Sequence, residues 1–423
     1  MNFILYMSSE NQLIAVKAIQ KKLLGKKLTH REIFILMDEI THHRLSEVLT
    51  AYFVASSFKE GYTSEELYLF TKAMVETGNK FHFDGIVADK HSTGGVAGTR
   101  TTMIVVPIIA AAGIKIPKIS SRAITTPAGT ADTMEVLAKV NLTPKEVIKI
   151  VDKVGGCIAW NEYLNIAPAD DIIIKVEEPL SFESFDKIII SVMAKKVAIG
   201  ATHLILDLPV GKTMKIRHFY DAENVKKKFT ELARKFKMKV VFDVNETLEP
   251  AGRGVGPALE AMDVLYVLEQ KTERPLKLEA KALRLAGKLL DLCFSDMGIK
   301  KSGEDEARRI LADGSALKKF REIIKAQHGD DQVSSETFKL KSHILEIRSP
   351  ESGKIKEINN LNLNALAKIL GAPNDKFAGI YLLKKLDEFV GKKEPIMKFY
   401  STDKYLLKEA KVSLRNFPIY EIE

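Results

Sequence analysis

Cysteine and tryptophan are scarce in this sequence, and long apolar runs are missing. Its 423 residues include two cysteines, Cys157 and Cys293, and one tryptophan. Two cysteines are too few for a disulfide framework or a cysteine metal cluster, so we expect buried thiols in a reducing compartment. The longest apolar stretch, 103–113, contains a proline and is shorter than the roughly 18 residues that span a bilayer. Residues 1–8 lack a basic start and a small-residue cleavage pattern, so we expect no export signal and a cytoplasmic protein.

Charge of neither sign dominates. The chain has 64 Lys and Arg against 55 Asp and Glu, which gives a formal charge of +9. Such an excess is compatible with nucleic acid, a membrane surface or an anionic small substrate as partner. The basic residues are interleaved with acids, and no RNA-binding signature with stacking aromatics accompanies them. We therefore expect a solvated, lysine-rich surface and neither a nucleic-acid nor a membrane partner.

Hydrophobic periodicity divides the chain into regions of different texture. Residues 1–80 carry apolar residues at helical spacing, which predicts a small all-helical domain. Residues 81–166 and 201–330 alternate short β-branched runs with helical patterns, which predicts a larger α/β domain with a parallel or mixed sheet. Residues 331–423 predict a C-terminal α+β subdomain. The fold class is therefore α/β with a helical domain and a C-terminal addition.

Single elements are also predicted by local signals. A strand is expected at 86–88, followed by a loop at 89–98, and a helix at 131–140. Near the C-terminus, the segments 338–348 and 354–358 flank a proline- and glycine-containing turn, which predicts a hairpin.

The glycine-rich segment 89–98, DKHSTGGVAG, is the strongest local signal. It lies between the predicted strand and a helix that starts near Thr101. Glycines let the backbone approach a ligand, and a helix N-terminus directs N–H groups at an anion. Lys90 adds a positive charge, while Ser92 and Thr101 add hydroxyl donors. These features indicate a phosphate site, and the alternative is a tight turn with a solvated lysine.

A second loop of similar character is found at 118–135, KISSRAITTPAGTADTME. Ligands of parallel sheets collect at the carboxyl ends of strands, so this loop should converge with the first. Ser120, Thr130 and Arg122, with the lysine of the first loop, would then enclose one phosphate. The alternative is that Thr130 and Asp132 merely cap a helix.

The two loops, with SVMAKK at 191–196 and the glycine-rich run 252–260, resemble the thymidine and pyrimidine nucleoside phosphorylase family. The similarity is strongest to its archaeal-type branch, which contains AMP phosphorylases and type 2 thymidine phosphorylases. It implies phosphorolysis, in which phosphate attacks the anomeric carbon and releases a base. It also implies a homodimer, no metal and no cofactor, with phosphate as co-substrate. By the same resemblance, we expect residues 167–200 to return to the helical domain across a cleft, and we expect the further N-terminal domain of the AMP branch to be missing here.

The resemblance assigns site residues position by position. Its phosphate-binding residues fall on Lys90, Ser92, Thr101, Ser120 and Thr130. Its nucleotide-binding residues fall on Gly95, Ser121, Arg122, Ala123, Ile124, Thr125, Thr126, Thr130, Ser191 and Lys215. Its catalytic residues fall on Glu183, Lys195, Ser191 and Arg122.

The general acid implied by the AMP branch is an aspartate, and Glu183 occupies that position. It must be protonated near neutral pH, which burial would promote by raising its pKa. The alternative is a first-turn acid that interacts with the helix dipole. Ser191 and Lys195 lie four residues apart and share a helical face. Their alternative is a helix-interior serine and a snorkelling lysine.

A nucleoside 5′-monophosphate requires a second anion site, for which Arg122 and Lys215 are candidates. We therefore expect conversion of AMP and phosphate to adenine and ribose 1,5-bisphosphate. One alternative is a thymidine or pyrimidine nucleoside phosphorylase that gives a base and (deoxy)ribose 1-phosphate. Another is a phosphoribosyltransferase with Mg²⁺ on Asp170 and Asp171. A third, from another class, is a non-catalytic nucleotide-binding regulator.

Overall fold

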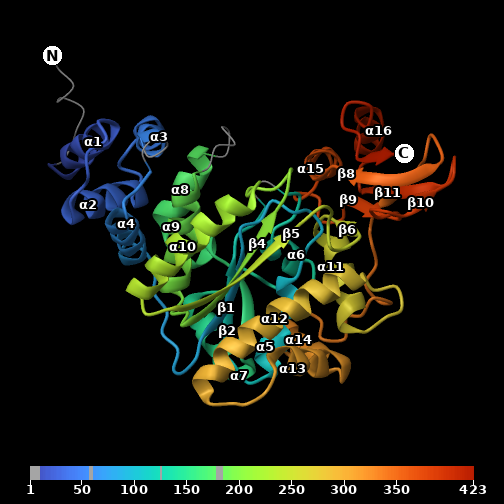
Figure 1. The fold of residues 1–423 in the computed structure, drawn as a ribbon, viewed down its shortest axis with the longest axis horizontal. Helices are drawn as coiled ribbons and strands as arrows, with labels where there is room; N and C mark the ends of the chain where they lie inside the picture. The colour runs from blue at the N-terminus through green and yellow to red at the C-terminus, as the bar shows by residue number, and fades with distance from the viewer. Residues whose placement is uncertain (1–9, 57–60, 124–125, 178–183) are drawn as a thin grey trace. The chain divides into compact units, whose positions relative to one another are not determined.

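The computed structural model describes residues 10–56, 61–123, 126–177 and 184–423. The chain forms two compact units, whose elements are labelled in Figure 1. The first unit contains Met1–Asp84, Asn161–Thr202 and Glu223–Val240, and the second contains Gly85–Trp160, His203–Ala222 and Val241–Glu423. Within the described ranges, every helix is too short or too polar to cross a bilayer.

The first unit is helical. Its helices are α1 (Glu10–Leu23), α2 (His30–Thr41), α3 (Glu47–Ser56), α4 (Ser64–Glu76), α8 (Pro168–Glu177), α9 (Phe185–Ala198) and most of α10 (Phe219–Lys235). Capping boxes fix the starts of α2 and α4, because Thr29 and Glu32, and likewise Thr63 and Glu66, bond each other's backbone N–H groups. The N-terminal helical domain of the predicted fold class is confirmed by this set of helices.

A parallel sheet organises the second unit. One part has the order β1 (Ala88–Ser92), β4 (His203–Val210), β5 (Lys239–Glu246), and β1 pairs with β4 in parallel. The other part pairs β2 (Ile116–Ser120) with β3 (Gly156–Trp160), also in parallel. A parallel bridge between Val87 and Lys115 joins the two parts. This arrangement brings the carboxyl ends of β1 and β2 to the same edge.

The helices of the second unit pack against this sheet. Helix α5 (Thr102–Ala111) is buried from Thr102 to Ala110, which explains why its sequence has no polar face. Helices α12 (Leu276–Met297), α13 (Gly303–Ala312) and α14 (Ser315–Ala326) gather around α5 in Figure 1. Two shorter connections carry α6 (Thr130–Glu135) and α7 (Pro144–Val154).

Two local predictions are wrong in their bounds. The first strand was expected at 86–88, but β1 covers Ala88–Ser92, because these residues continue the ladder with β4. Lys90 and Ser92 therefore lie on the strand and not in the loop. The helix expected at 131–140 ends at Glu135, where the N–H of Leu137 turns back to the carbonyl of Met134.

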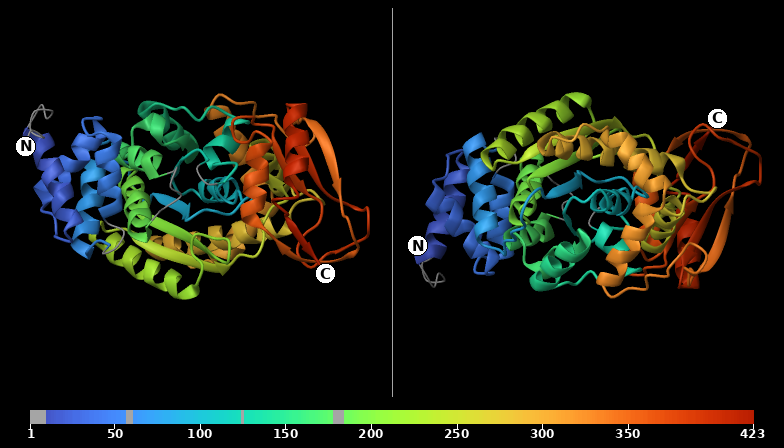
Figure 2. Two further views of the ribbon diagram at one scale, coloured as in Figure 1. Left: turned by 90° about the horizontal axis from the view of Figure 1, so that it is seen from above. Right: turned by 90° about the horizontal axis from the view of Figure 1, so that it is seen from below.

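The C-terminal region of the second unit contains two small sheets. One has the order β6 (Gly254–Val255), β9 (Gly379–Leu382), β11 (Pro395–Ser401), β7 (His343–Arg348). The other has the order β10 (Phe389–Val390), β8 (Gly353–Ile358), β12 (Tyr420–Ile422). Helices α11 (Pro257–Leu268), α15 (Asn360–Ile369) and α16 (Lys404–Ser413) accompany them. In both views of Figure 2 these orange-to-red strands lie together.

The predicted hairpin is wrong. Strand β7 pairs with β11, whereas β8 pairs with β10 and β12, so the turn between them leads from one sheet to the other. Burial explains the difference, because Ile347, Ile355 and Phe399 from both sheets enter one hydrophobic core. A single two-stranded hairpin would leave these side chains in water.

Candidate functional site

The first predicted anion-binding segment, 89–98, begins on β1, which contains Lys90 and Ser92, and continues into the loop after it. Lys90 is 3% exposed, and its Nζ donates a hydrogen bond to Thr102 Oγ1 at 3.4 Å. Burial lowers the pKa of Lys90 to about 8, although the charge of Asp207 opposes this shift. A buried ammonium group that stays charged near neutral pH favours an anionic ligand beside it.

Two hydroxyl groups, one in this loop and one at the start of the helix that follows it, are buried without a hydrogen-bond partner among the described residues. Thr101 is fully buried and Thr93 is 6% exposed, yet the Oγ1 atoms of both find no hydrogen-bond partner among the described residues. Buried polar atoms in folded proteins are nearly always hydrogen-bonded. Thr101 precedes the first turn of α5, and its hydroxyl is one of the predicted phosphate ligands. The geometry therefore fits a bound group with acceptor oxygens at this place.

Gly95 and Lys215 come together in the second unit. A Cβ at Gly95 would lie 3.5 Å from Cγ of Lys215, and Gly95 has a left-handed φ of 85°. Asn360 of α15 holds the same loop, because its side-chain amide donates to the Gly95 carbonyl at 2.6 Å and its oxygen accepts the Ala97 N–H at 3.0 Å. Sequence analysis missed Asn360, whose partners are more than 260 residues away.

The second loop is shaped around Asp132. Its carboxylate accepts the N–H of Gly129 at 3.0 Å and the N–H of Ala123 at 2.6 Å. Asp132 is therefore a capping residue, as the alternative interpretation held for this position. A Cβ at Gly129 would lie 2.5 Å from the Arg122 carbonyl carbon, so only glycine allows the loop to fold back on itself. The Ser120 hydroxyl donates to the Ser121 carbonyl at 3.3 Å, and Thr126 donates to the Ala128 carbonyl at 3.0 Å.

Arg122 is already engaged by acidic side chains. Its two Nη atoms lie 2.5 Å from the carboxylate oxygens of Glu135, and Nη1 lies 3.2 Å from Asp132. The guanidinium also stacks on Trp160, with Cζ 4.5 Å from the ring centroid. Arg122 holds the pKa of Glu135 down at about 2. A second phosphate on Arg122 would have to compete with these carboxylates.

Arg100 joins the two loops and was not among the predicted residues. Its Nη1 donates to Thr130 Oγ1 at 3.0 Å, and its Nη2 donates to the Ala128 carbonyl at 2.6 Å. Its Nε donates to Glu260, which is 1% exposed, at 2.8 Å. The sequence shows Arg100 beside Thr101, but nothing local indicates contacts with Thr130 and Glu260, which are 30 and 160 residues away.

In the first unit, the predicted pair Ser191 and Lys195 lies on one face of α9 and meets α8. The Ser191 hydroxyl donates to Asp170 Oδ2 at 2.8 Å, and Lys195 Nζ lies 2.5 Å from the same oxygen. Lys195 Nζ also lies 3.3 Å from Ser191 Oγ. Asp170 therefore orients both residues, a role that sequence analysis did not give it.

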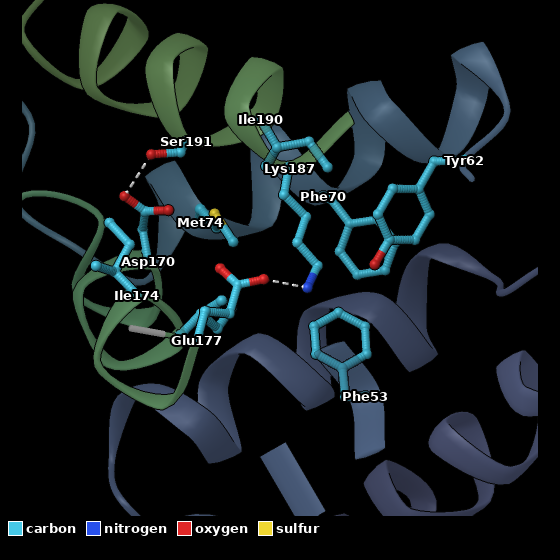
Figure 3. A pocket seen from close by; sticks show the side chains of 11 residues that line it. Phe53, Tyr62, Phe70, Met74, Asp170, Ile174, Glu177, Lys187, Ile190 and Ser191 are labelled. Atoms are coloured by element: carbon cyan, nitrogen blue, oxygen red, sulfur yellow. Dashed lines mark hydrogen bonds and ion pairs between the residues drawn. The ribbon is translucent and has the colours of Figure 1, made fainter. Parts of the chain in front are cut away.

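A small cavity of about 20 Å³ lies beside this cluster in the first unit, with room for roughly one water. Figure 3 shows Asp170 bonded to Ser191 on one side of it and Glu177 paired with Lys187 on the other. Phe70 and Tyr62 complete its wall. Burial raises the pKa of the neighbouring Asp171 to about 7, and its carboxylate accepts a hydrogen bond from Asn161 at 2.8 Å.

Three predicted residues, Glu183, Ile124 and Thr125, lie outside the described residues. Their assignments stay predictions. In the part of the chain that the structure describes, no group of three or more His, Cys, Asp or Glu side chains is placed to hold a metal ion.

Comparison with known protein families shows to which family the chain belongs. The family described as "Glycosyl transferase family, a/b domain" matches residues 84–317, which is more than half of the sequence. The chain belongs to this glycosyl transferase family. The family's helical bundle domain matches residues 16–78, and a pyrimidine nucleoside phosphorylase C-terminal domain matches residues 354–419. The resemblance inferred from the motifs is thereby confirmed.

Relatives within the glycosyl transferase family cover most of the chain. An AMP phosphorylase of Archaeoglobus fulgidus is 42% identical over 94% of this chain and 78% of its own. Further relatives with the name AMP phosphorylase are 39% to 44% identical. A protein of Bradyrhizobium diazoefficiens with a provisional thymidine phosphorylase name is 41% identical over 92% of this chain and 75% of its own.

Among solved structures, the anthranilate phosphoribosyltransferase of Thermus thermophilus has the same glycosyl transferase fold. Its TM-score is 0.58 at 18% identity, over 74% of this chain and 99% of that one. This similarity concerns the fold alone.

Proposed function

We propose that this member of the glycosyl transferase family is a phosphorylase that converts AMP and inorganic phosphate to adenine and ribose 1,5-bisphosphate. The assignment of AMP as the substrate rests on the 39% to 44% identity to several AMP phosphorylases over most of the chain. Two buried groups support phosphate as the second substrate: the Thr101 hydroxyl, which has no partner among the described residues, and the Lys90 ammonium group, which bonds the adjacent Thr102.

The chemistry requires little covalent participation by the protein. An oxygen of phosphate forms a bond to C1′ of the ribose while the C1′–N9 bond breaks and its electron pair leaves with adenine. A proton must reach the departing base, and the protein must hold the phosphate next to C1′. The proposal assigns the phosphate to Lys90, Ser92, Thr101, Ser120 and Thr130, and it assigns the base to Ser191 and Lys195.

Glu183 is proposed as the proton donor to the departing adenine. The carboxyl group must be protonated at the start of the reaction, which a buried position would favour. Glu183→Gln is expected to slow adenine release more than uracil or thymine release, because a pyrimidine anion needs less help to leave. Equal slowing with purine and pyrimidine substrates, measured from initial rates, would remove Glu183 from this role.

The contacts of Asp170 argue against a Mg²⁺-dependent phosphoribosyltransferase. Its Oδ2 is shared by the Ser191 hydroxyl and the Lys195 ammonium group, so a cation would have to displace a lysine. We propose a reaction that needs no metal and no cofactor. Undiminished phosphate-dependent turnover in excess EDTA is expected, and activity restored only by Mg²⁺ would contradict it.

A product assay tests the function directly. The protein is incubated with phosphate and, separately, with AMP, CMP, UMP, adenosine, uridine and thymidine, and released bases are separated by chromatography. We expect adenine from AMP, with a strict requirement for phosphate. Lys90→Met should abolish phosphate-dependent release of adenine. Lys115→Met, which removes a lysine paired with Asp152 at the surface, is the matched control and should retain activity.

A second candidate is phosphorolysis of pyrimidine nucleosides. It is favoured by the C-terminal domain match and by the relative with the thymidine phosphorylase name. Release of thymine or uracil without turnover of AMP would select it. Binding of nucleotides with no base release from any substrate would instead indicate a non-catalytic regulator.

Two further properties belong to the proposal. We expect a homodimer, as the family resemblance implies, and we expect it to be located in the cytoplasm. Light scattering coupled to gel filtration measures the first, and cell fractionation measures the second.

A further inference from the structure

Arg100 occupies a central place between the two phosphate loops. It precedes Thr101 and α5, and its guanidinium group contacts Thr130 and Ala128 of the second loop. Glu260, in the first turn of α11, holds the guanidinium group in place. Its Oε2 atom lies 2.8 Å from Nε and 2.6 Å from Nη2 of Arg100. The other Glu260 oxygen accepts the N–H of Gly256 at 3.2 Å, so the carboxylate is itself held in place.

The direction of the bond to Thr130 has a chemical consequence. A guanidinium group has only donors, so Thr130 Oγ1 must accept from Arg100 at 3.0 Å. The single hydroxyl proton of Thr130 is then directed to a different acceptor. A phosphate oxygen is such an acceptor, and Thr130 is one of its predicted ligands. Polarisation by a cation also makes the hydroxyl a stronger donor.

The charge of Arg100 also reaches Lys90. It is among the causes that lower the pKa of Lys90, so the two cations lie close enough to repel each other. An anion bound beside both would relieve that repulsion.

We infer that Arg100 is a positioning residue for phosphate, which orients the Thr130 hydroxyl as a donor and ties the second loop to Glu260. This inference rests on the proposed use of phosphate. It extends that proposal, because it names a residue that sets the affinity for phosphate and takes no part in the bond-making or proton-transfer steps.

Arg100→Lys is the first test. A lysine keeps a charge for Glu260 but lacks the planar fork that reaches Glu260, Thr130 and Ala128 together. The KM for phosphate is expected to rise about tenfold, the loss typical of one charged hydrogen bond. The KM for AMP should change less than about twofold, as expected for a role confined to phosphate. Arg253→Lys is the matched control, since Arg253 is part-buried and donates to the Leu382 and Leu383 carbonyls.

A double-mutant cycle with Thr130→Val separates orientation of the hydroxyl from general structural support. If Arg100 acts through Thr130, the double variant should be about as impaired as either single variant, about tenfold and not about a hundredfold. Glu260→Gln, which loosens Arg100 without changing it, should raise the phosphate KM severalfold and serves if Arg100→Lys does not fold. An unchanged phosphate KM in Arg100→Lys, or multiplicative effects in the double variant, would overturn the inference.

Calorimetric titration with inorganic phosphate separates this inference from the proposed function. If the wild-type protein binds phosphate but releases no base, the function is wrong, and weaker binding in Arg100→Lys than in Arg253→Lys still supports the role of Arg100. If the wild-type protein releases base and both variants bind phosphate equally, only the role of Arg100 is wrong. A wild-type protein that binds no phosphate would overturn both.

Discussion

Replacement of Asp170 by asparagine should weaken the hold of α8 on both Ser191 and Lys195. The Asp170 side chain is 4% exposed, and one of its oxygens takes both the serine hydroxyl and the lysine ammonium group. The change Asp170→Asn keeps the shape and removes the negative charge. Removal of one partner of a buried ion pair costs about 3 to 5 kcal/mol, because the remaining charge stays in a poor solvent.

The lower end of this range applies here, because Lys195 is 12% exposed and keeps its contact with Ser191. A loss of about 3 kcal/mol corresponds to a melting temperature about 10 °C lower for a domain of this size. Turnover should fall about 100-fold, since misplacement of a positioning group by about 1 Å costs that much. Differential scanning fluorimetry and the base-release assay measure the two effects.

Asp171→Asn is the matched control. It makes the same chemical change at the next residue of α8, but its expected effect on the stability of the protein has the opposite sign. Burial raises the pKa of Asp171 to about 7, so its contribution to stability is present at low pH and lost as the pH rises through 7. Asp171→Asn should therefore stabilise the protein more at pH 8 than at pH 5, and it should change stability little only below the ordinary Asp pKa of about 4. Equal melting temperatures of wild type and Asp170→Asn, or equal losses in both variants, would refute this reasoning.

Three further predictions concern the second unit. The pKa of Lys90 is lowered to about 8, so the phosphate KM should rise as the pH increases from 7 to 9, and a flat profile would contradict a charged Lys90 at the site. Burial raises the pKa of both Cys157 and Cys293 to about 12, so neither thiol should react with iodoacetamide at pH 8 until denaturant is added, as mass spectrometry can determine. A Cβ at Gly379 would lie 2.0 Å from the Val255 carbonyl oxygen, so Gly379→Ala should lower the free energy of unfolding by about 3 kcal/mol or more in urea titrations; an unchanged midpoint would show that β9 can shift.

Much of the fold follows from local patterns in the sequence. The α2 helix begins at a Thr29–Glu32 capping box, and alternating strands and helices predict the parallel sheet, because these signals act over a few residues. The pairing of β8 was not predictable in the same way. Its partners β10 and β12 are distant in the sequence, and the choice between them and β7 depends on which side chains share a core.

The candidate site shows the same division between local and distant signals. Lys90 and Thr101 are recognisable because glycines and a helix start surround them. Arg100 and Asn360 were missed, and the contacts of Asp170 were not predicted, because each acts through a partner that only the folded chain brings near. Only the phosphoribosyltransferase alternative placed Mg²⁺ on Asp170, and in the structure the Asp170 carboxylate pairs with Lys195 of the next helix.

Strand β6 has a consequence for how this protein evolves and can be engineered. It comes from the α/β portion of the chain but is the edge of a sheet whose other strands are C-terminal, and Asn360 reaches from the same region to the glycine loop. Truncation of the chain after α14 would remove β9, the strand that pairs with β6, and Asn360, which bonds the glycine-rich segment at Gly95. The last ninety or so residues therefore cannot be removed without loss of contacts in the rest of the chain. Exchanging them between relatives should alter how tightly the glycine-rich segment 89–98 is held.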